Sequence, residues 1–162
     1  MKKITKIIIS LCCILQLSAC ANTTTTAPLA FGVTPAATLL ATDNTFMKGY
    51  ESFSLSQKDI NTIKLWPSEL RVEVFFGTWC HDSQREVPKL LKILTNNNNI
   101  ETKLIALDYQ KSDPNGLSKS KGIKYTPTFI FYKNNQEIGR IIERPTSSLV
   151  ADITYFLNRE ID

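Results

Sequence analysis

The stretch FFGTWCHDS, residues 75–83, joins two patterns of different period in this 162-residue chain. The apolar and partly β-branched run over 71–76 predicts a buried strand. Residues 84–94 predict an amphipathic helix whose apolar face consists of Val87, Leu90, Leu91 and Leu94. Cys80 therefore stands between a strand and a helix N-terminus, where the helix dipole favours a thiolate. Three residues further on, where a second redox cysteine would stand, the chain has Ser83.

The N-terminal residues have the pattern of a secretory signal. A basic start precedes the mainly apolar stretch 7–17, which is too short for an ordinary transmembrane helix. Its end, Leu17-Ser18-Ala19-Cys20, resembles the bacterial lipobox. In such signals the peptide is cut just before the cysteine, which is then lipidated. The alternatives are an ordinary cleaved signal, with Cys20 incidental, and a retained membrane anchor.

Lipobox processing would leave one free thiol in the mature chain. Cleavage before Cys20 removes Cys12 and Cys13, and the lipid occupies Cys20, so that Cys80 remains. The protein would then be exported and lipid-anchored to the cell envelope. Because Ala21 rather than Asp follows the cysteine, outer-membrane sorting, facing the periplasm, is implied for a Gram-negative cell. The loss of three lysines from the 19 basic residues leaves 16 against 15 acidic ones, which argues against a nucleic-acid partner.

Composition divides the chain into a signal peptide over 1–19, a flexible Thr-, Ala- and Pro-rich tether over 20–45 and a folded domain over 46–162. Within the domain, the patterns predict an edge strand over 50–53, a helix from Ser56 that stops at Pro67, strands over 102–109, 128–132 and 137–142, a short helix over 117–121 and a last helix capped by Thr146 or Ser147. A parallel first half with an antiparallel finish predicts an α/β sandwich with helices on both faces of the sheet.

This order of elements, with three motifs in register, resembles the thioredoxin superfamily over about residues 50–162. Residues 75–80 resemble the strand and active-site loop, and Pro88 lies eight residues after Cys80, where thioredoxins have a helix-kinking proline. Tyr125-Thr126-Pro127-Thr128 resembles the cis-proline loop. The resemblance is to single-cysteine proteins with a Trp-Cys-x-Asp-Ser motif, and it implies a three-layer α/β/α sandwich with a central mixed sheet.

Two departures from the family pattern argue against a full dithiol cycle. Ser83 replaces the resolving cysteine. Val74, six residues before Cys80, takes the place of the buried Asp that in thioredoxins helps to deprotonate the resolving thiol. Because that acid has no task without a second thiol, the two losses agree with each other. Residues 143–145, Glu-Arg-Pro, stand where the family has a small glycine, which implies charge at the rim of the substrate face.

Four residues of the central stretch are candidates for the site. Cys80 is interpreted as a reactive thiol rather than a buried structural cysteine. The Ser83 hydroxyl either donates to the thiolate or caps the helix in a capping box with Glu86. His81, the only histidine, either supports the thiolate, relays a proton, or is an exposed residue without a role. The resemblance implies that Trp79 forms an apolar ledge beside the thiol; packing alone is the alternative.

Thr126 and Pro127 are the candidate substrate-binding residues outside that stretch. In the family a cis peptide bond between them leaves backbone groups of Thr126 to pair with an extended substrate segment. The alternative is a trans proline that opens an edge strand. One histidine and one mature thiol cannot form a closed four-ligand zinc site, and no cofactor is indicated.

The first functional hypothesis is an oxidoreductase-like, monothiol exchange of disulfides through a mixed disulfide at Cys80. Its partners would be protein or small-molecule thiols and disulfides, with an external thiol or a reductase for recycling. The alternative is a non-enzymatic binding or holdase module that docks extended segments at the cis-proline loop. A one-cysteine peroxidase shares the fold and is a third reading, but Gly77 stands where the peroxiredoxin motif has a threonine.

Overall fold

The computed structural model describes residues 30–159, so the predicted signal peptide, Cys20 and the tether residues before Ala30 lie outside the described part. In chain order the elements are β1 (Gly32–Val33), α1 (Ala36–Thr42), α2 (Asn44–Ser52), α3 (Gln57–Lys64), β2 (Leu70–Phe76), α4 (His81–Leu94), β3 (Glu101–Ala106), α5 (Leu117–Ser120), β4 (Thr128–Lys133), β5 (Gln136–Ile142) and α6 (Leu149–Asn158). In this part of the chain, no helix has the length and apolar character needed to cross a membrane.

The strands form one mixed sheet in the order β1-β3-β2-β4-β5. β2 runs parallel to β3 and antiparallel to β4, while β4 and β5 form an antiparallel pair. Since β2 lies at the centre, its last residues, Val74, Phe75 and Phe76, are fully buried on both faces of the sheet. This arrangement confirms the predicted α/β class with a central mixed sheet.

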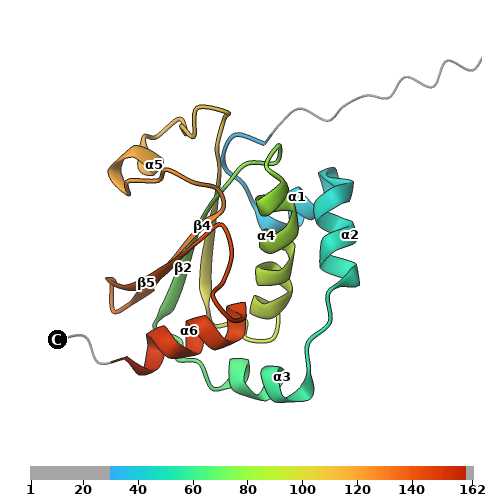
Figure 1. Cartoon of the computed structure of the whole chain (residues 1–162), viewed down its shortest axis with the longest axis vertical. Helices are drawn as coiled ribbons and strands as arrows, with labels where there is room; N and C mark the ends of the chain where they lie inside the picture. Colours follow the sequence, from blue (N-terminus) through green and yellow to red (C-terminus); the bar gives the residue numbers. More distant parts are fainter. Residues whose placement is uncertain (1–29, 160–162) are drawn as a thin grey trace, which may run out of the picture.

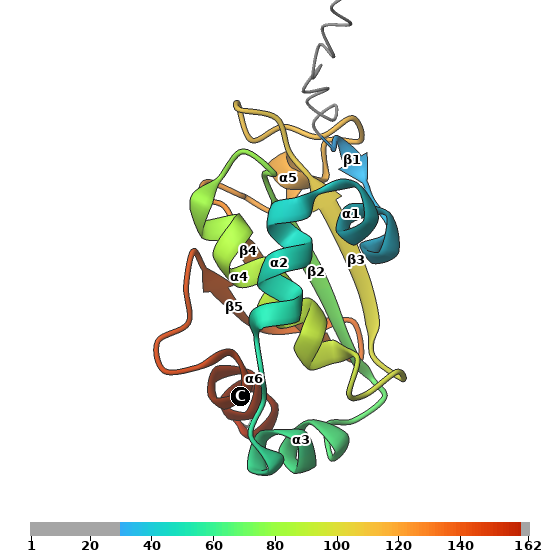
Figure 2. The same ribbon diagram turned by 90° about the vertical axis from the view of Figure 1, so that its right-hand side faces the viewer.

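Helices lie on both faces of the sheet, in unequal layers (Figures 1 and 2). On one face α1, α2, α3, α4 and α6 pack on the larger core, to which β2 contributes Val72, Val74 and Phe76. On the other face the short α5 packs Leu117 against a smaller cluster, which consists of Phe75, Ile105, Leu107, Ile130 and Tyr132. The helix that follows Cys80 therefore belongs to the thick layer.

Charged side chains line part of the second face. The carboxylate of Glu73 accepts from Arg71 at 2.7 Å and from the Tyr132 hydroxyl at 2.9 Å, and Lys121 lies 3.9 Å away. Burial by itself would raise the pKa of Glu73. The hydrogen bonds from Arg71 and Tyr132, with the charges of Lys121 and Arg71, outweigh burial and lower that pKa below its ordinary value.

The folded domain begins earlier than the composition predicts. The flexible tether predicted as far as residue 45 is wrong for β1, α1 and the first turn of α2. Leu39 and Phe46 are buried, and the ring of Phe46 packs edge-on against Phe76 with centroids 5.7 Å apart. The Asp43 carboxylate caps α2 by accepting two backbone amides. A weakly polar, Thr-rich segment therefore folds because its few apolar side chains reach the core.

The edge strand predicted over 50–53 is also wrong, because Tyr50 lies within α2. Figure 2 shows α2 alongside α4. A Cβ at Gly49 would lie 3.1 Å from Pro88, so the two helices approach closely there. The ammonium of Lys92 lies 4.4 Å from the centre of the Tyr50 ring. The N-terminal part of the chain therefore supports the helix that follows Cys80.

The remaining predicted elements are present, but several of their ends differ from the predicted ones. The helix predicted over 84–94 begins at His81. The cap of α6 is Ser148, whose hydroxyl accepts a backbone amide, rather than Thr146 or Ser147. Those two residues instead donate their amides to a carboxylate within α6, so the chain enters this helix one residue later than predicted.

Candidate active site

Cys80 is the residue from which α4 starts. Its amide donates to the carbonyl of Gly77 at 3.0 Å, and its own carbonyl accepts from the amide of Gln84 at 2.9 Å. The thiol is free and partly buried, and Sγ donates to the backbone carbonyl of Thr126 at 3.1 Å. Two loops that lie 46 positions apart in the sequence therefore meet at this sulfur.

The second of these loops contains a cis peptide bond between Thr126 and Pro127. The carbonyl of Pro127 accepts from the amide of Glu143 at 2.7 Å, which joins this loop to the one that follows β5. Thr126 is buried as a whole residue, and its backbone N–H finds no hydrogen-bond partner among residues 30–159. An extended peptide laid beside Cys80 would meet this free donor, as in strand addition.

Ser83 is fully buried and holds the turn that precedes the helix. Its hydroxyl oxygen accepts from the amide of Gly77 at 3.2 Å. The predicted capping box is wrong, because Cys80 occupies the N-cap position and the Glu86 carboxylate pairs with two cations of α4. Within the described chain no hydrogen bond joins the Ser83 hydroxyl to the sulfur of Cys80. Its place in the structure is therefore that of a positioning residue.

The two residues that follow Cys80 face away from the core. His81 is exposed at the first position of α4, and its ring has no hydrogen-bond or ion-pair partner between residues 30 and 159. Asp82 pairs with Arg85 at 2.6 Å, and both side chains are partly exposed. An acid in the first turn complements the helix dipole, and this is the role we assign to Asp82.

Trp79 is held on three sides. Its indole Nε1 donates to the carbonyl of Leu107 at 3.1 Å, and its ring stacks on Tyr109 with centroids 4.9 Å apart. A Cβ at Gly77 would lie 2.5 Å from the indole, so that only glycine leaves room for it. The ammonium of Lys111 lies 5.9 Å from the ring centre. The side chain that the resemblance predicts as a ledge is thus fixed at the end of the sheet.

Tyr109 is the site residue that sequence reasoning missed. The sequence pattern places it at the end of the strand predicted over 102–109, whereas β3 ends at Ala106. The signal was available in the parallel pairing of β2 with β3, in which Phe76 lies opposite Ala106. Residues at equal distances after the carboxyl ends of parallel neighbours meet at the same edge of the sheet. Trp79 and Tyr109 each follow their strand by three positions, and therefore they stack.

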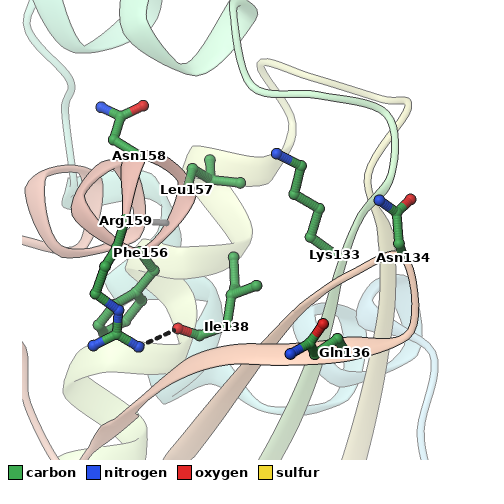
Figure 3. Close-up of a pocket in the computed structure, with 8 residues that line it drawn as sticks. All are labelled: Lys133, Asn134, Gln136, Ile138, Phe156, Leu157, Asn158 and Arg159. Carbon is green, nitrogen blue, oxygen red and sulfur yellow. Dashed lines mark hydrogen bonds between the residues drawn. The ribbon is translucent and has the colours of Figure 1, made fainter. Parts of the chain in front are cut away.

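Two cavities of the described chain lie away from the thiol. A cavity of about 320 Å³ lies between the β4–β5 turn and the end of α6, where Arg159 donates to the carbonyl of Ile138 at 3.0 Å (Figure 3). Another of about 520 Å³ lies between α1 and the end of α4. Neither is lined by Cys80. Between residues 30 and 159 no three metal-ligating side chains gather.

A free thiol at the start of a helix, directly after the central strand and against a loop with a cis proline, defines a thioredoxin-fold thiol site. The family comparison agrees with this class. A model described as thioredoxin matches residues 36–152, and the chain belongs to the thioredoxin family. The match begins at Ala36, the first residue of α1, in agreement with the early start of the folded domain.

Known proteins resemble this chain at low identity. Thioredoxin H9 of Arabidopsis thaliana is 30% identical over 84 residues, which are 52% of this chain and 57% of that protein, so that the chain spans little more than half of this relative. A protein of unknown function from Pseudomonas aeruginosa matches with a TM-score of 0.56 at 18% identity, over 75% of this chain and 80% of that chain. Thioredoxin of Fasciola hepatica matches with a TM-score of 0.44 at 25% identity, over 62% and 89%. The family supports a thiol–disulfide redox function in general terms.

Proposed function

We propose that the protein carries out monothiol thiol–disulfide exchange at Cys80 while a lipid on Cys20 tethers it to a membrane of the cell envelope. The observation that carries the exchange is the contact of Sγ with the carbonyl of Thr126, beside a free backbone N–H of the same residue. A substrate segment that pairs with this backbone would lie directly over the sulfur. The lipobox-like sequence that ends at Cys20 motivates the tether.

The exchange step needs one thiol and no electrons from outside. Cys80 loses its proton to solvent, and its thiolate attacks one sulfur of a partner disulfide. The new bond joins Cys80 Sγ to that sulfur, the old disulfide breaks, and the second partner sulfur leaves as a thiolate that takes up a proton. Trp79, fixed on Gly77 and Leu107, supplies an apolar wall for the partner beside the sulfur.

Release of the partner requires a second thiol, which Ser83 does not supply. A thiolate of the same substrate that attacks the mixed disulfide regenerates Cys80 and leaves the substrate with a rearranged disulfide. A low-molecular-weight thiol or a partner reductase would release the substrate in the reduced state instead. Both routes use the same first step, so the test addresses that step.

The test uses a peptide whose cysteine carries a chromogenic aromatic thiol. We expect wild type to release the chromophore and to gain the mass of the peptide, while Cys80→Ser does neither. The Ser83→Cys variant should take up the peptide and then discharge it, because a second sulfur three positions on attacks the mixed disulfide. A wild-type mixed disulfide that discharges without added thiol, or chromophore release by Cys80→Ser, would contradict monothiol exchange.

A binding module that uses the same surface remains the second candidate, because Tyr125, next to the free N–H of Thr126, is 53% exposed. It predicts that Cys80→Ser binds unfolded peptide as well as wild type does, in the presence of reductant, and that no mixed disulfide accumulates. The tether is tested separately. Mass spectrometry of the protein extracted from membranes should show a diacylglyceryl-modified N-terminal Cys20, which is absent in Cys20→Ala.

A further inference from the structure

The chain enters the sheet beside the thiol. In β1, Gly32 lies opposite Ala106 of β3, which in turn lies opposite Phe76 of β2. Since neighbouring strands are about 4.8 Å apart, Gly32 lies about 10 Å from the strand end that leads to Cys80. β1 is antiparallel to β3, so Ala30 and Phe31 lie toward the end of the sheet that carries the thiol. In Figures 1 and 2 the first described residues and the start of α4 lie at the same end of the molecule.

The entry point also contacts the loop that supports the site. A Cβ at Gly32, whose φ is +83°, would lie 3.3 Å from the ring of Pro114. Pro114 belongs to the same loop, between β3 and α5, as Tyr109, which stacks on Trp79. The loop between β3 and α5 therefore contacts both the first strand and the tryptophan beside Cys80.

Large apolar side chains are exposed at the same end. Residues 30–159 expose seven such side chains, and five of them surround the thiol end of the sheet: Phe31, Val33, Tyr109, Tyr125 and Ile142. Ile142 belongs to this group because it lies opposite Thr128, the residue after the cis proline. The other two, Leu65 and Tyr155, lie on α3 and α6. We call the five residues the apolar rim.

The number of residues between Cys20 and the domain limits how far the apolar rim can lie from a membrane that holds Cys20. Ala30 is ten residues after Cys20. Whatever path those residues take, they span at most about 36 Å when fully extended. The opposite end of the sheet lies further away, because the seven residues of β2 add about 23 Å. With a lipid on Cys20, the point where the tether joins the domain, at the end that carries Cys80, would therefore stay within about 36 Å of the bilayer.

We infer that the partner of Cys80 is a cysteine-bearing segment of a protein held at the same membrane, docked between the apolar rim and the bilayer. The inference rests on the proposed function, both the exchange at Cys80 and the anchor at Cys20. The partner disulfide is attacked as described above, so the step remains balanced. A partner bound to the same surface gains in effective concentration over one that diffuses freely, provided that its cysteine lies within the span of the tether.

The experiment uses the lipidated full-length protein in vesicles and the chromogenic peptide as a molecular ruler. One peptide is attached to a lipid by a short spacer, and a second is held by a rigid helical stalk about 100 Å above the surface, which corresponds to about 67 helical residues. We expect wild type to react at least tenfold faster with the short probe. An insertion of about 30 residues before Ala30 adds about 100 Å of contour length and should restore reaction with the tall probe.

Equal rates of wild type with both probes would overturn the inference and point to a freely diffusing partner. The same peptide free in solution reports the exchange alone. Failure of that reaction would refute the proposed function. A normal rate with the free peptide, together with equal rates for the two probes, would refute only the inference that the partner is held at the membrane. The variant Phe31→Ser/Val33→Ser tests the rim and should slow the short probe at least threefold. It should leave the reaction of a small soluble disulfide unchanged, because neither residue contacts Cys80.

Discussion

The variant Gly77→Ala tests whether the fixed position of Trp79 matters to the thiol. A Cβ at this position would lie 2.5 Å from Cε2, 2.7 Å from Nε1 and 2.9 Å from Cζ2 of the indole. These atoms belong to a rigid ring, so the whole side chain must move. Any movement that clears the contact takes Nε1 away from the carbonyl of Leu107 and tilts the ring relative to Tyr109.

The cost follows from the two contacts that are lost. A hydrogen bond contributes about 0.5–1.5 kcal/mol, and a stacked aromatic pair contributes about 0.5–1.5 kcal/mol beyond its buried area. We therefore expect the free energy of unfolding to fall by about 2 kcal/mol. For a domain of this size that corresponds to a decrease in Tm of about 6–10 °C. The rate of mixed-disulfide formation with a peptide should fall with it, because the wall beside Cys80 has moved.

Urea denaturation and chromophore release from the peptide measure the two effects. Fluorescence in a Trp66→Phe background reports the displaced indole directly, because Trp66 and Trp79 are the two tryptophans of the chain. The control is Gly139→Ala, whose Cβ would lie 2.6 Å from the Phe156 ring, away from the thiol. It should destabilise the domain and leave the exchange rate unchanged. Normal stability, fluorescence and exchange in Gly77→Ala would refute the view that Gly77, Leu107 and Tyr109 fix the position of the Trp79 side chain.

Three further outcomes follow from the contacts of the structure. Ser83→Ala leaves the buried amide of Gly77 unpaired, so the free energy of unfolding measured in urea should fall by about 1–3 kcal/mol, while Cys80 still takes up the peptide. Loss of peptide uptake in a folded variant would instead indicate a catalytic role for the Ser83 hydroxyl. Phe46→Ala should lower the free energy of unfolding by about 3–5 kcal/mol, because this ring is fully buried in the core. A decrease below about 1 kcal/mol would indicate that α2 is not part of the folded domain. The pKa of Glu73 is lower in the folded chain than in the unfolded one, so its contribution is present above the unfolded pKa and is lost as the pH falls below about 4.5. Between neutral pH and that range, the free energy of unfolding should fall less steeply with pH in Glu73→Gln than in wild type. Identical slopes for the two proteins would contradict a stabilising role of the contacts that Glu73 makes with Arg71, Tyr132 and Lys121.

The sequence predicts best those elements whose hydrophobic pattern matches their position in the fold. β2 is apolar and central, and α4 presents one continuous apolar face, so that local pattern and tertiary position agree. The N-terminal elements lacked such a pattern. α1 buries Leu39 and α2 buries Phe46, one fully buried side chain each. Their stability comes from the surface that they meet, which composition does not report.

The site could be predicted in its residues and only partly in its contacts. Cys80 and Thr126 lie together as the resemblance implies, since both follow from loops of a recurring fold. The role of Ser83 was open because a hydroxyl at that spacing fits a cap as well as a thiolate. The decision depends on where the helix begins, and α4 begins three residues before the predicted start. Helix ends are set by local hydrogen bonds, which sequence patterns locate poorly.

The early start of the domain changes what the proposed anchor can do. Had the folded part begun at residue 46, 26 residues would separate it from Cys20, with a span of about 90 Å. With a tether of that length, the domain could take any orientation relative to the membrane when Cys80 meets a partner. β1, a strand of two residues that begins at Gly32, leaves twelve residues instead and places their attachment beside the thiol. With a lipid on Cys20, the shortest strand of the sheet would therefore restrict which partners Cys80 meets, in addition to the lipid holding the protein at the membrane.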